Sequence, residues 1–122
     1  MRMKHSRKRT IFLRNRNISK DSEGVPIVSY GDPIKMTGET WPAGSKLQIA
    51  TYGDRINSIH NVRIEGKYSI AVDKNVQKYV FDGFTLQEGD GVHLFADKKA
   101  DPDYKIVCIK PHKPLYMEVE KL

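Results

Sequence analysis

The sequence predicts a mainly β protein: a small antiparallel β-barrel or sandwich with one short helix or long loop insertion. Short apolar segments recur along most of the 122 residues, clusters of turn residues separate them, and only one stretch has a helical pattern. Domains typically hold roughly 100–150 residues, so a chain of this length forms one domain. We therefore expect a flexible basic tail over residues 1–8 and a single β-barrel domain over residues 9–122.

The first pair of strands follows directly on the tail. Between Arg9 and Ile18, apolar side chains fall on both faces of an alternating pattern, which indicates a strand partly covered on each side. Residues 20–24 form a cluster of turn residues, and residues 25–30 are typical of the returning strand. Pro26 has no N–H to donate to a sheet, which favours an edge position or the start of the strand.

The only helical pattern follows an extended segment at 34–37 and a stretch at 38–46, whose Gly and Pro residues predict a loop. Ser45 and Gln48 have the spacing of a capping box. Four apolar side chains then recur at helical spacing, namely Ile49, Tyr52, Ile56 and Ile59. We expect a short helix near residues 45–57 with one apolar stripe, while a period of two in the same stretch leaves a strand as the alternative.

The second half of the chain has β character throughout. Strands are expected at residues 68–72, 78–81, 92–95, 104–110 and 115–120. Residues 88–91 form a turn with two glycines, and residues 97–103 form a solvated loop. Leu115, Met117 and Val119 alternate along the last strand, so they share one face.

The charge of the chain is concentrated at its N-terminus. The chain has 21 Lys and Arg against 15 Asp and Glu, a net charge of +6. Residues 1–20 hold eight basic side chains and no acidic one, and these are Arg2, Lys4, Arg7, Lys8, Arg9, Arg14, Arg16 and Lys20. The other 102 residues hold 13 basic and 15 acidic side chains, a net charge of −2. We expect this basic N-terminal segment to bind DNA or an acidic protein surface, against the alternative of a solvated terminus.

No catalytic or metal-binding motif is visible in the sequence. The four histidines are dispersed, and none lies beside the single cysteine, Cys108, as nucleophilic catalysis needs. Cys108 lies within a predicted strand, where we expect it to be a buried small apolar residue. Asp97, Asp101 and Asp103 lack the spacing of a calcium-binding loop, and two lysines lie among them. We therefore expect a protein that is not an enzyme and that binds no cofactor and no metal.

The compartment follows from the same composition. One cysteine cannot form an internal disulfide, so a reducing compartment is the default. No apolar run approaches the roughly 20 residues of a membrane-spanning helix, and no apolar core of a signal peptide follows the charged N-terminus. We expect no membrane partner.

The order of the segments is distinctive. A basic strand at 7–16 and a turn at 20–24 precede WPAGSKL at 41–47, YGDRIN at 52–57, EGDGV at 88–92, DPDYKIV at 101–107 and MEVEKL at 117–122. This order resembles the small head–tail connector proteins of long-tailed bacteriophages and prophages, of the head-completion or stopper type. The resemblance covers most of residues 7–122.

The resemblance implies a subunit of a homo-oligomeric ring in the phage neck, between the portal or adaptor and the tail-terminator or tail proteins. Such a ring continues or closes the channel through which double-stranded DNA passes after packaging. It implies assembly in the bacterial cytoplasm and a final location in the virion. In stopper proteins a loop after the first hairpin closes the channel, and the matching region here is 37–59. Its candidate channel or interface residues are Thr40, Trp41, Lys46, Tyr52, Asp54 and Arg55.

Other readings of the same residues stay open. A tail-terminator type of neck protein has a similar size, and a small β-barrel that binds nucleic acid would also use a basic N-terminal segment. Trp41 is the only tryptophan, and it either anchors an interface or covers the barrel.

Overall fold

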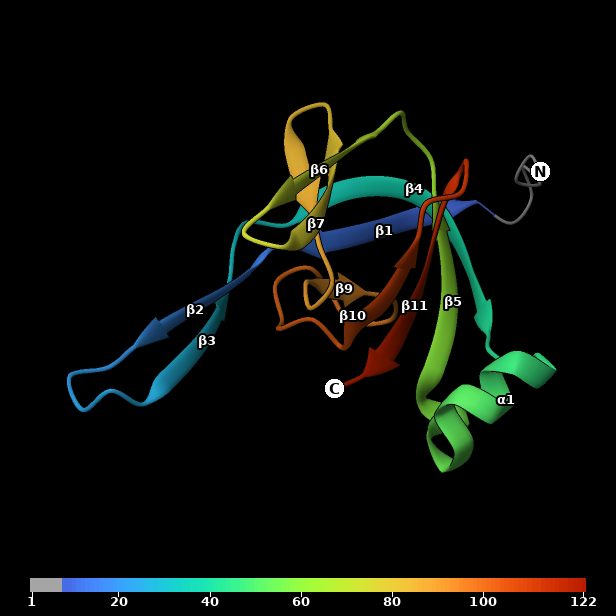
Figure 1. The fold of residues 1–122 in the computed structure, drawn as a ribbon, viewed down its shortest axis with the longest axis horizontal. Coiled ribbons are helices and arrows are strands. Elements are labelled where there is room, and N and C mark those ends of the chain that lie inside the picture. Colours follow the sequence, from blue (N-terminus) through green and yellow to red (C-terminus); the bar gives the residue numbers. More distant parts are fainter. Residues whose placement is uncertain (1–7) are drawn as a thin grey trace.

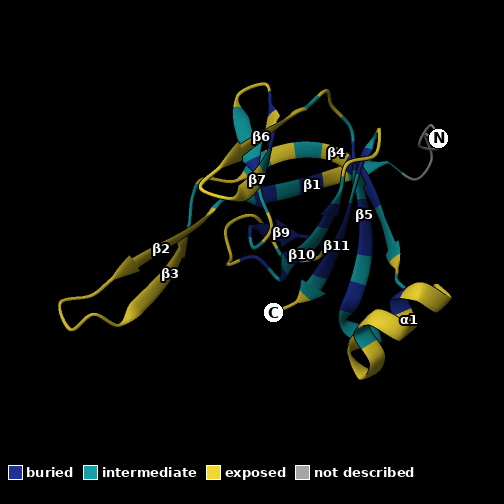
Figure 2. Cartoon of the chain, in the orientation of Figure 1, coloured by how far each residue is buried: buried dark blue, intermediate teal, exposed yellow. Residues whose placement is uncertain are grey.

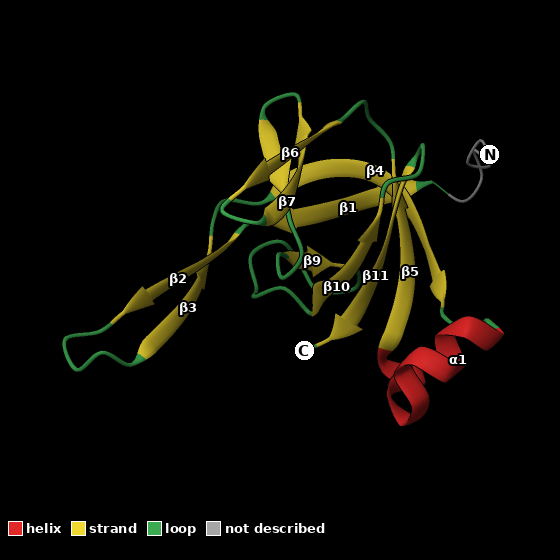
Figure 3. Cartoon of the chain, in the orientation of Figure 1, coloured by secondary structure: helices red, strands yellow, loops and turns green. Residues whose placement is uncertain are grey.

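The computed structural model describes residues 8–122. Figure 3 shows a mainly β chain with one short helical segment, and six of the strands close into an antiparallel barrel. The barrel strands, in the order in which they pair, are β1 (Arg9–Arg14), β4 (Ile34–Pro42), β5 (Ile59–Ile64), β11 (Leu115–Lys121), β10 (Tyr104–Lys110) and β9 (Gly91–His93). This architecture confirms the predicted fold class.

Three further parts project from the barrel (Figure 1). The first, which we call the arm, is the two-stranded hairpin of β2 (Arg16–Lys20) and β3 (Pro26–Tyr30). The second is a three-stranded sheet of β6 (Ser69–Asp73), β7 (Val76–Phe81) and β8 (Phe84–Leu86). The third is the helix α1 (Lys46–Tyr52), which continues as the 3-10 helix η2 (Gly53–Ser58). The arm and α1 lie at opposite ends of the long axis of the molecule.

The apolar core fills the barrel and extends under the three-stranded sheet, as the buried residues of Figure 2 show. Its fully buried members from the barrel strands include Ile11, Leu13, Val62, Ile64, Val92, Leu115, Met117 and Val119. Phe81 and Phe84 stack with their ring centres 4.9 Å apart and belong to the same apolar cluster. The predicted common face of Leu115, Met117 and Val119 is therefore confirmed as a core face.

The single strand predicted from Arg9 to Ile18 is wrong in one respect, because the chain leaves the barrel at Asn15. β1 ends at Arg14 and β2 begins at Arg16. The buried carboxylate of Asp90 accepts hydrogen bonds from the backbone N–H of Arg16 at 2.9 Å and from the Asn15 side chain at 3.0 Å. These bonds hold the chain at the point where it turns from the barrel into the arm. Pro26 is the first residue of β3, as predicted.

The predicted loop at 38–46 is also wrong in its first half, because β4 continues through Pro42 and pairs with β5. Gly38 explains this difference. A Cβ atom at position 38 would lie 2.3 Å from the carbonyl oxygen of Arg63 on the neighbouring strand. The glycine therefore permits a close approach between two barrel strands, and it marks no loop.

The helix begins at the predicted capping box, in which Ser45 and Gln48 each bond the other's backbone. It ends earlier than expected, because Gly53 has a positive φ of 55° and the chain continues as η2. The predicted apolar stripe is wrong as well. Ile59 belongs to β5, Ile49 is 51% exposed, and the only buried residue of α1 is Gln48. Hydrogen bonds, not apolar contacts, attach this helix to the barrel.

The C-terminal strands match the prediction closely, with two differences. β8 was not predicted, and β9 is shorter than expected because it ends at His93. The Asp103 carboxylate accepts hydrogen bonds from the backbone N–H groups of Leu94 and Phe95, at 2.9 and 3.0 Å. It therefore ends the strand and anchors the loop at 97–103, for which the sequence predicts only exposure to solvent.

Candidate assembly surfaces

The basic residues of the N-terminal segment, which are predicted to bind a partner together, do not gather into one patch within residues 8–122. Arg2, Lys4 and Arg7 lie outside the described residues. Lys8 forms an ion pair with Glu65. The guanidinium carbon of Arg9 lies 5.3 Å from the centre of the Phe95 ring. Both side chains are therefore held against the body of the protein.

The remaining three basic residues lie on β1 and β2, on either side of the point where the chain leaves the barrel. Arg14 donates hydrogen bonds to the carbonyl oxygen of Gly31, at 3.3 Å, and to that of Lys98. Arg16 and Lys20 are exposed on β2. The basic residues predicted to act together are thus divided between the barrel and the arm.

The six residues predicted as a channel or interface segment lie on β4, α1 and η2. They are Thr40, Trp41, Lys46, Tyr52, Asp54 and Arg55. Lys46 and Asp54 are exposed. The Thr40 hydroxyl donates a hydrogen bond to the carbonyl oxygen of Asn61 at 2.9 Å. The structure brings Tyr52 and Arg55 together on one side of the helical segment, where both contact β11.

Trp41 lies on the outer wall of the barrel and is half-buried. Its ring centre is 6.1 Å from that of Tyr116, and the guanidinium carbon of Arg63 lies 5.1 Å from the Trp41 ring centre. Both neighbours belong to adjacent barrel strands. Trp41 therefore packs on the outside of the barrel, a position that fits both interpretations of this residue.

Gln48 is the centre of the contact between α1 and the barrel. Its amide nitrogen donates hydrogen bonds to the side-chain oxygens of Asn61 and Glu118, each at 2.5 Å. Its amide oxygen accepts a hydrogen bond from the backbone N–H of Ser45 at 3.3 Å. One side chain thus caps the helix and fastens it to β5 and β11. A buried amide with these partners holds the helix in one position, because moving it leaves polar groups unpaired.

Two tyrosines complete the same contact. The Tyr52 hydroxyl donates a hydrogen bond to Glu118 at 2.9 Å, and the Tyr116 hydroxyl donates one to Asn61. Burial raises the pKa of Tyr52 above its usual range, and the bond to Glu118 adds to that effect. Burial, with the nearby Glu118 carboxylate, raises the pKa of Tyr116 to about 12. Both hydroxyls therefore stay protonated at neutral pH and remain donors.

Arg55 adds an exposed contact at the edge of this set. Its guanidinium donates two hydrogen bonds to the carboxylate of Glu120, each at 2.8 Å. We call Gln48, Tyr52 and Arg55 with their partners on β5 and β11 the polar latch. The apolar side chains of α1 point the other way, since Leu47 is 69% exposed.

Sequence reasoning missed the central members of the polar latch. The capping box drew attention to Gln48, but nothing in its spacing shows that the same amide also reaches the barrel. Glu118 alternates with Met117 and Val119, so the pattern places it on the outer face, where an acidic residue is ordinarily solvated. Only the position of α1 over that face explains why Glu118 is buried.

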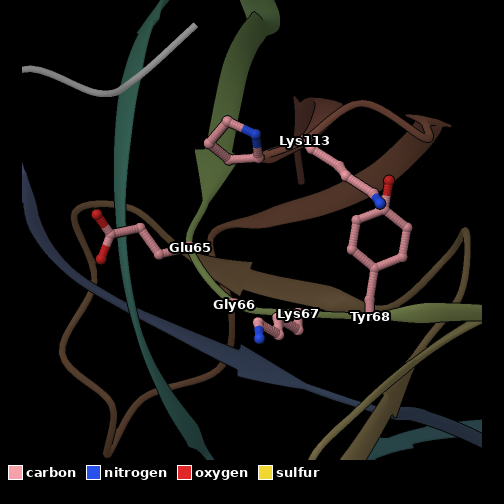
Figure 4. Close-up of a pocket in the computed structure, with 6 residues that line it drawn as sticks. Glu65, Gly66, Lys67, Tyr68 and Lys113 are labelled. Atoms are coloured by element: carbon pink, nitrogen blue, oxygen red, sulfur yellow. The ribbon is translucent and has the colours of Figure 1, made fainter.

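A hollow of about 570 Å³ lies beside residues 65–68 and 113–114 (Figure 4). Lys113 extends toward Tyr68 in this view, whereas Glu65 points away. The Glu65 carboxylate pairs with Lys8, and the Tyr68 hydroxyl donates a hydrogen bond to the carbonyl oxygen of His112 at 2.6 Å. These polar groups are engaged with the chain itself, so they do not converge on a point where a substrate would react.

A second hollow, of about 450 Å³, separates α1 from β10. Cys108 lies in its lining and is half-buried, so the prediction of a buried residue is only partly met. Burial raises the pKa of this thiol, which disfavours the reactive thiolate. Within residues 8–122, no group of three or more His, Cys, Asp or Glu side chains is placed to hold a metal ion. No helix of that range is long and apolar enough to cross a membrane.

Comparisons with protein-family models, with curated proteins and with solved structures find no match to this chain. The class that the fold and its surfaces define is therefore a small antiparallel β-barrel with projecting apolar elements.

Proposed function

We propose that this protein is a structural subunit of a bacteriophage neck, of the head-completion or stopper type. In this proposal it forms a homo-oligomeric ring between the portal or adaptor and the tail proteins, and the ring continues or closes the channel for double-stranded DNA. The proposal rests on the resemblance of the sequence and on the distribution of exposed apolar side chains.

The distribution of exposed apolar side chains carries the proposal. Ten of the twelve large apolar residues that are exposed within the described chain lie on the three projecting parts. They are Ile18, Val25, Ile27 and Val28 in the arm, Leu47 and Ile49 in α1, and Ile70, Val72, Val76 and Val80 in β6 and β7. Exposed apolar side chains that are concentrated on projecting elements favour an interaction with another macromolecule. A subunit that assembles in more than one direction needs several such surfaces, as a neck protein does.

The polar latch fixes the direction in which residues 46–58 present their exposed side. Its buried bonds hold the helical segment in one position against the barrel, so Leu47 and Ile49 face away from it. In the proposed ring this segment faces the axis, and Leu47 and Ile49 meet an axial neighbour.

The experiment is native mass spectrometry of the full chain over a range of concentrations, followed by negative-stain electron microscopy of the largest species. We expect a closed ring with an open or plugged centre. A monomer at every concentration contradicts the proposal. A monomer that binds a fluorescent single-stranded oligonucleotide more tightly than a duplex supports the small nucleic-acid-binding barrel instead.

A further inference from the structure

The two projecting sheets of the described chain have four edge strands, β2, β3, β6 and β8, of which β2 and β6 concern the proposal below. β2 pairs only with β3, and β6 pairs only with β7. Each contains five residues. The outer side of such a strand presents unpaired N–H and C=O groups, which form a template for pairing with another strand.

Both strands are exposed along their whole length. Every residue of β2 and of β6 is exposed, as Figure 2 shows for the arm. Ile18 is 60% exposed and lies directly opposite Val28 on β3, and Val72 on β6 is 71% exposed. A two-stranded hairpin is marginally stable in water, and further strands with an apolar face are needed to stabilise it. We therefore expect a third strand to stabilise the arm and to cover its exposed apolar side chains.

The charges of the two strands are complementary. β2 carries Arg16 and Lys20 and no acidic residue, whereas β6 carries Asp73 and no basic residue. Pairing the two strands brings unlike charges near each other and sets no like charges directly between them. The other edge of the arm is less suitable, because β3 begins with Pro26, which has no N–H to donate.

β6 of the same chain is not the partner of β2. In Figure 1 the arm points away from the barrel, and the sheet that contains β6 lies on the other side of the point where the arm leaves it. The two sheets are not joined within one chain. A strand of five residues reaches about 17 Å, which carries the apolar part of the arm beyond the surface of its own subunit.

We propose that β2 of one copy pairs with β6 of a neighbouring copy and extends its sheet to five strands, in the order β3–β2–β6–β7–β8. This contact rests on the proposed ring and names the interaction that joins its subunits. It is heterologous, because two different surfaces meet, and such contacts generate a ring when the rotation between subunits closes. Each subunit offers one arm and accepts one, so every copy in the ring has the same two contacts.

Cross-linking of two separate variants tests the pairing. In a Cys108→Ser background, Ile18→Cys is placed in one preparation and Ile70→Cys in another, and a short bismaleimide joins thiols that lie close together. We expect cross-linked dimers in the mixture and none in either preparation alone, because only an arm-to-β6 contact brings the two positions together. Circular dichroism of each variant checks that the fold is kept.

The other outcomes each overturn the pairing in a different way. Cross-linking of the Ile18→Cys protein alone shows arms that pair with each other, and cross-linking of the Ile70→Cys protein alone shows β6 paired with β6. A ring in native mass spectrometry without the mixed dimer overturns this contact but leaves the proposed function. The absence of both ring and dimer overturns the two together.

A charge introduced into the arm gives a second, independent measurement. Ile18→Lys is expected to weaken assembly at least tenfold, because an ammonium group then lies at the centre of the pairing strand. The matched control is Leu122→Lys, because Leu122 is 58% exposed, follows β11 and belongs to neither projecting sheet; this variant is expected to leave the oligomer unchanged. Unchanged assembly of the Ile18→Lys protein, or equal loss in both, overturns the proposed contact.

Discussion

Strands β1 and β2 follow each other in the chain with a single residue between them, yet their surroundings are opposite. Ile11 and Leu13 of β1 are fully buried in the barrel, whereas Ile18 of β2 is 60% exposed in the arm. The sequence predicts both as parts of one strand from Arg9 to Ile18. The difference arises at Asn15, where bonds to the buried Asp90 turn the chain out of the barrel.

The comparison shows that one continuous segment divides into a half that stabilises the core and an exposed half, to which we assign the proposed contact between subunits. The barrel half contributes side chains to the core, and burying a Leu or Ile side chain stabilises the fold by roughly 1.5–3 kcal/mol. The arm half contributes nothing to that core, so its apolar residues are available to a partner. The same division holds for α1, whose polar side faces the barrel and whose Leu47 faces solvent.

The largest expected effect tests the comparison directly. Leu13→Ala removes a fully buried side chain of β1 and should lower the free energy of unfolding by about 2–5 kcal/mol, because it leaves a cavity. Ile18→Ala, measured on the monomer, should change it by less than about 0.5 kcal/mol. Urea denaturation followed by circular dichroism gives both values. Similar losses for the two variants would mean that the arm shares the core after all.

The next effect concerns Asp90, whose carboxylate holds the chain where it turns from β1 into β2. Asp90→Ala removes the acceptor for the N–H groups of Arg16 and Gln87 and for the Asn15 side chain. We expect a loss of about 2–3 kcal/mol, since each buried donor left unpaired costs about 1–3 kcal/mol. Asp101→Ala, at an exposed position, is the control and should change stability by less than about 0.5 kcal/mol. A loss no larger than that of the control would show that the turn holds without Asp90.

The polar latch should respond locally. Gln48→Ala removes the donor to Asn61 and Glu118 and leaves a buried carboxylate with one partner fewer. We expect a loss of about 1–2 kcal/mol, together with faster amide hydrogen exchange over 46–52 and unchanged exchange in the barrel. Thr51→Ala is the control, because its hydroxyl bonds only within the helix, to the Leu47 carbonyl oxygen. Unchanged exchange in the Gln48→Ala protein would contradict the latch.

The smallest expected effect is a dependence of the folding stability on pH, which arises from two histidines of the barrel. Burial lowers the pKa of His60 and of His93, and Arg14 lowers the latter further while Asp103 opposes both shifts. The unfolded chain has a histidine pKa of about 6.5 and so binds more protons than the folded one below that pH. Stability should therefore fall as the pH decreases below about 6.5.

Thermal unfolding at two pH values, about 7.5 and about 5.5, measures this dependence for the natural protein and for His93→Gln. The difference should be smaller in the variant, by less than about 1.4 kcal/mol per pH unit for the one histidine removed. An equal or larger pH difference in the variant would assign the dependence to other groups.

Local pattern alone predicted much of this fold. The returning strand at 25–30, the strand at 104–110 and the capping box at Ser45 all follow from alternation or from fixed short spacings. Such features depend on neighbours in the chain, which a sequence displays. Gly38 was misread because its meaning depends on Arg63, which lies 25 residues further along the chain and on the facing strand.

The amino-acid sequence by itself determined that this chain is a small β protein with one helix start, since period, turn residues and capping act within a few positions. The tertiary structure alone decided which strands close the barrel, which stay free, and that Gln48 and Glu118 meet across 70 residues. Those outcomes depend on long-range pairing, in which a strand's neighbours are chosen by the whole core. That is why β1 and β2, which are adjacent in the chain, differ in their pairing and in their burial.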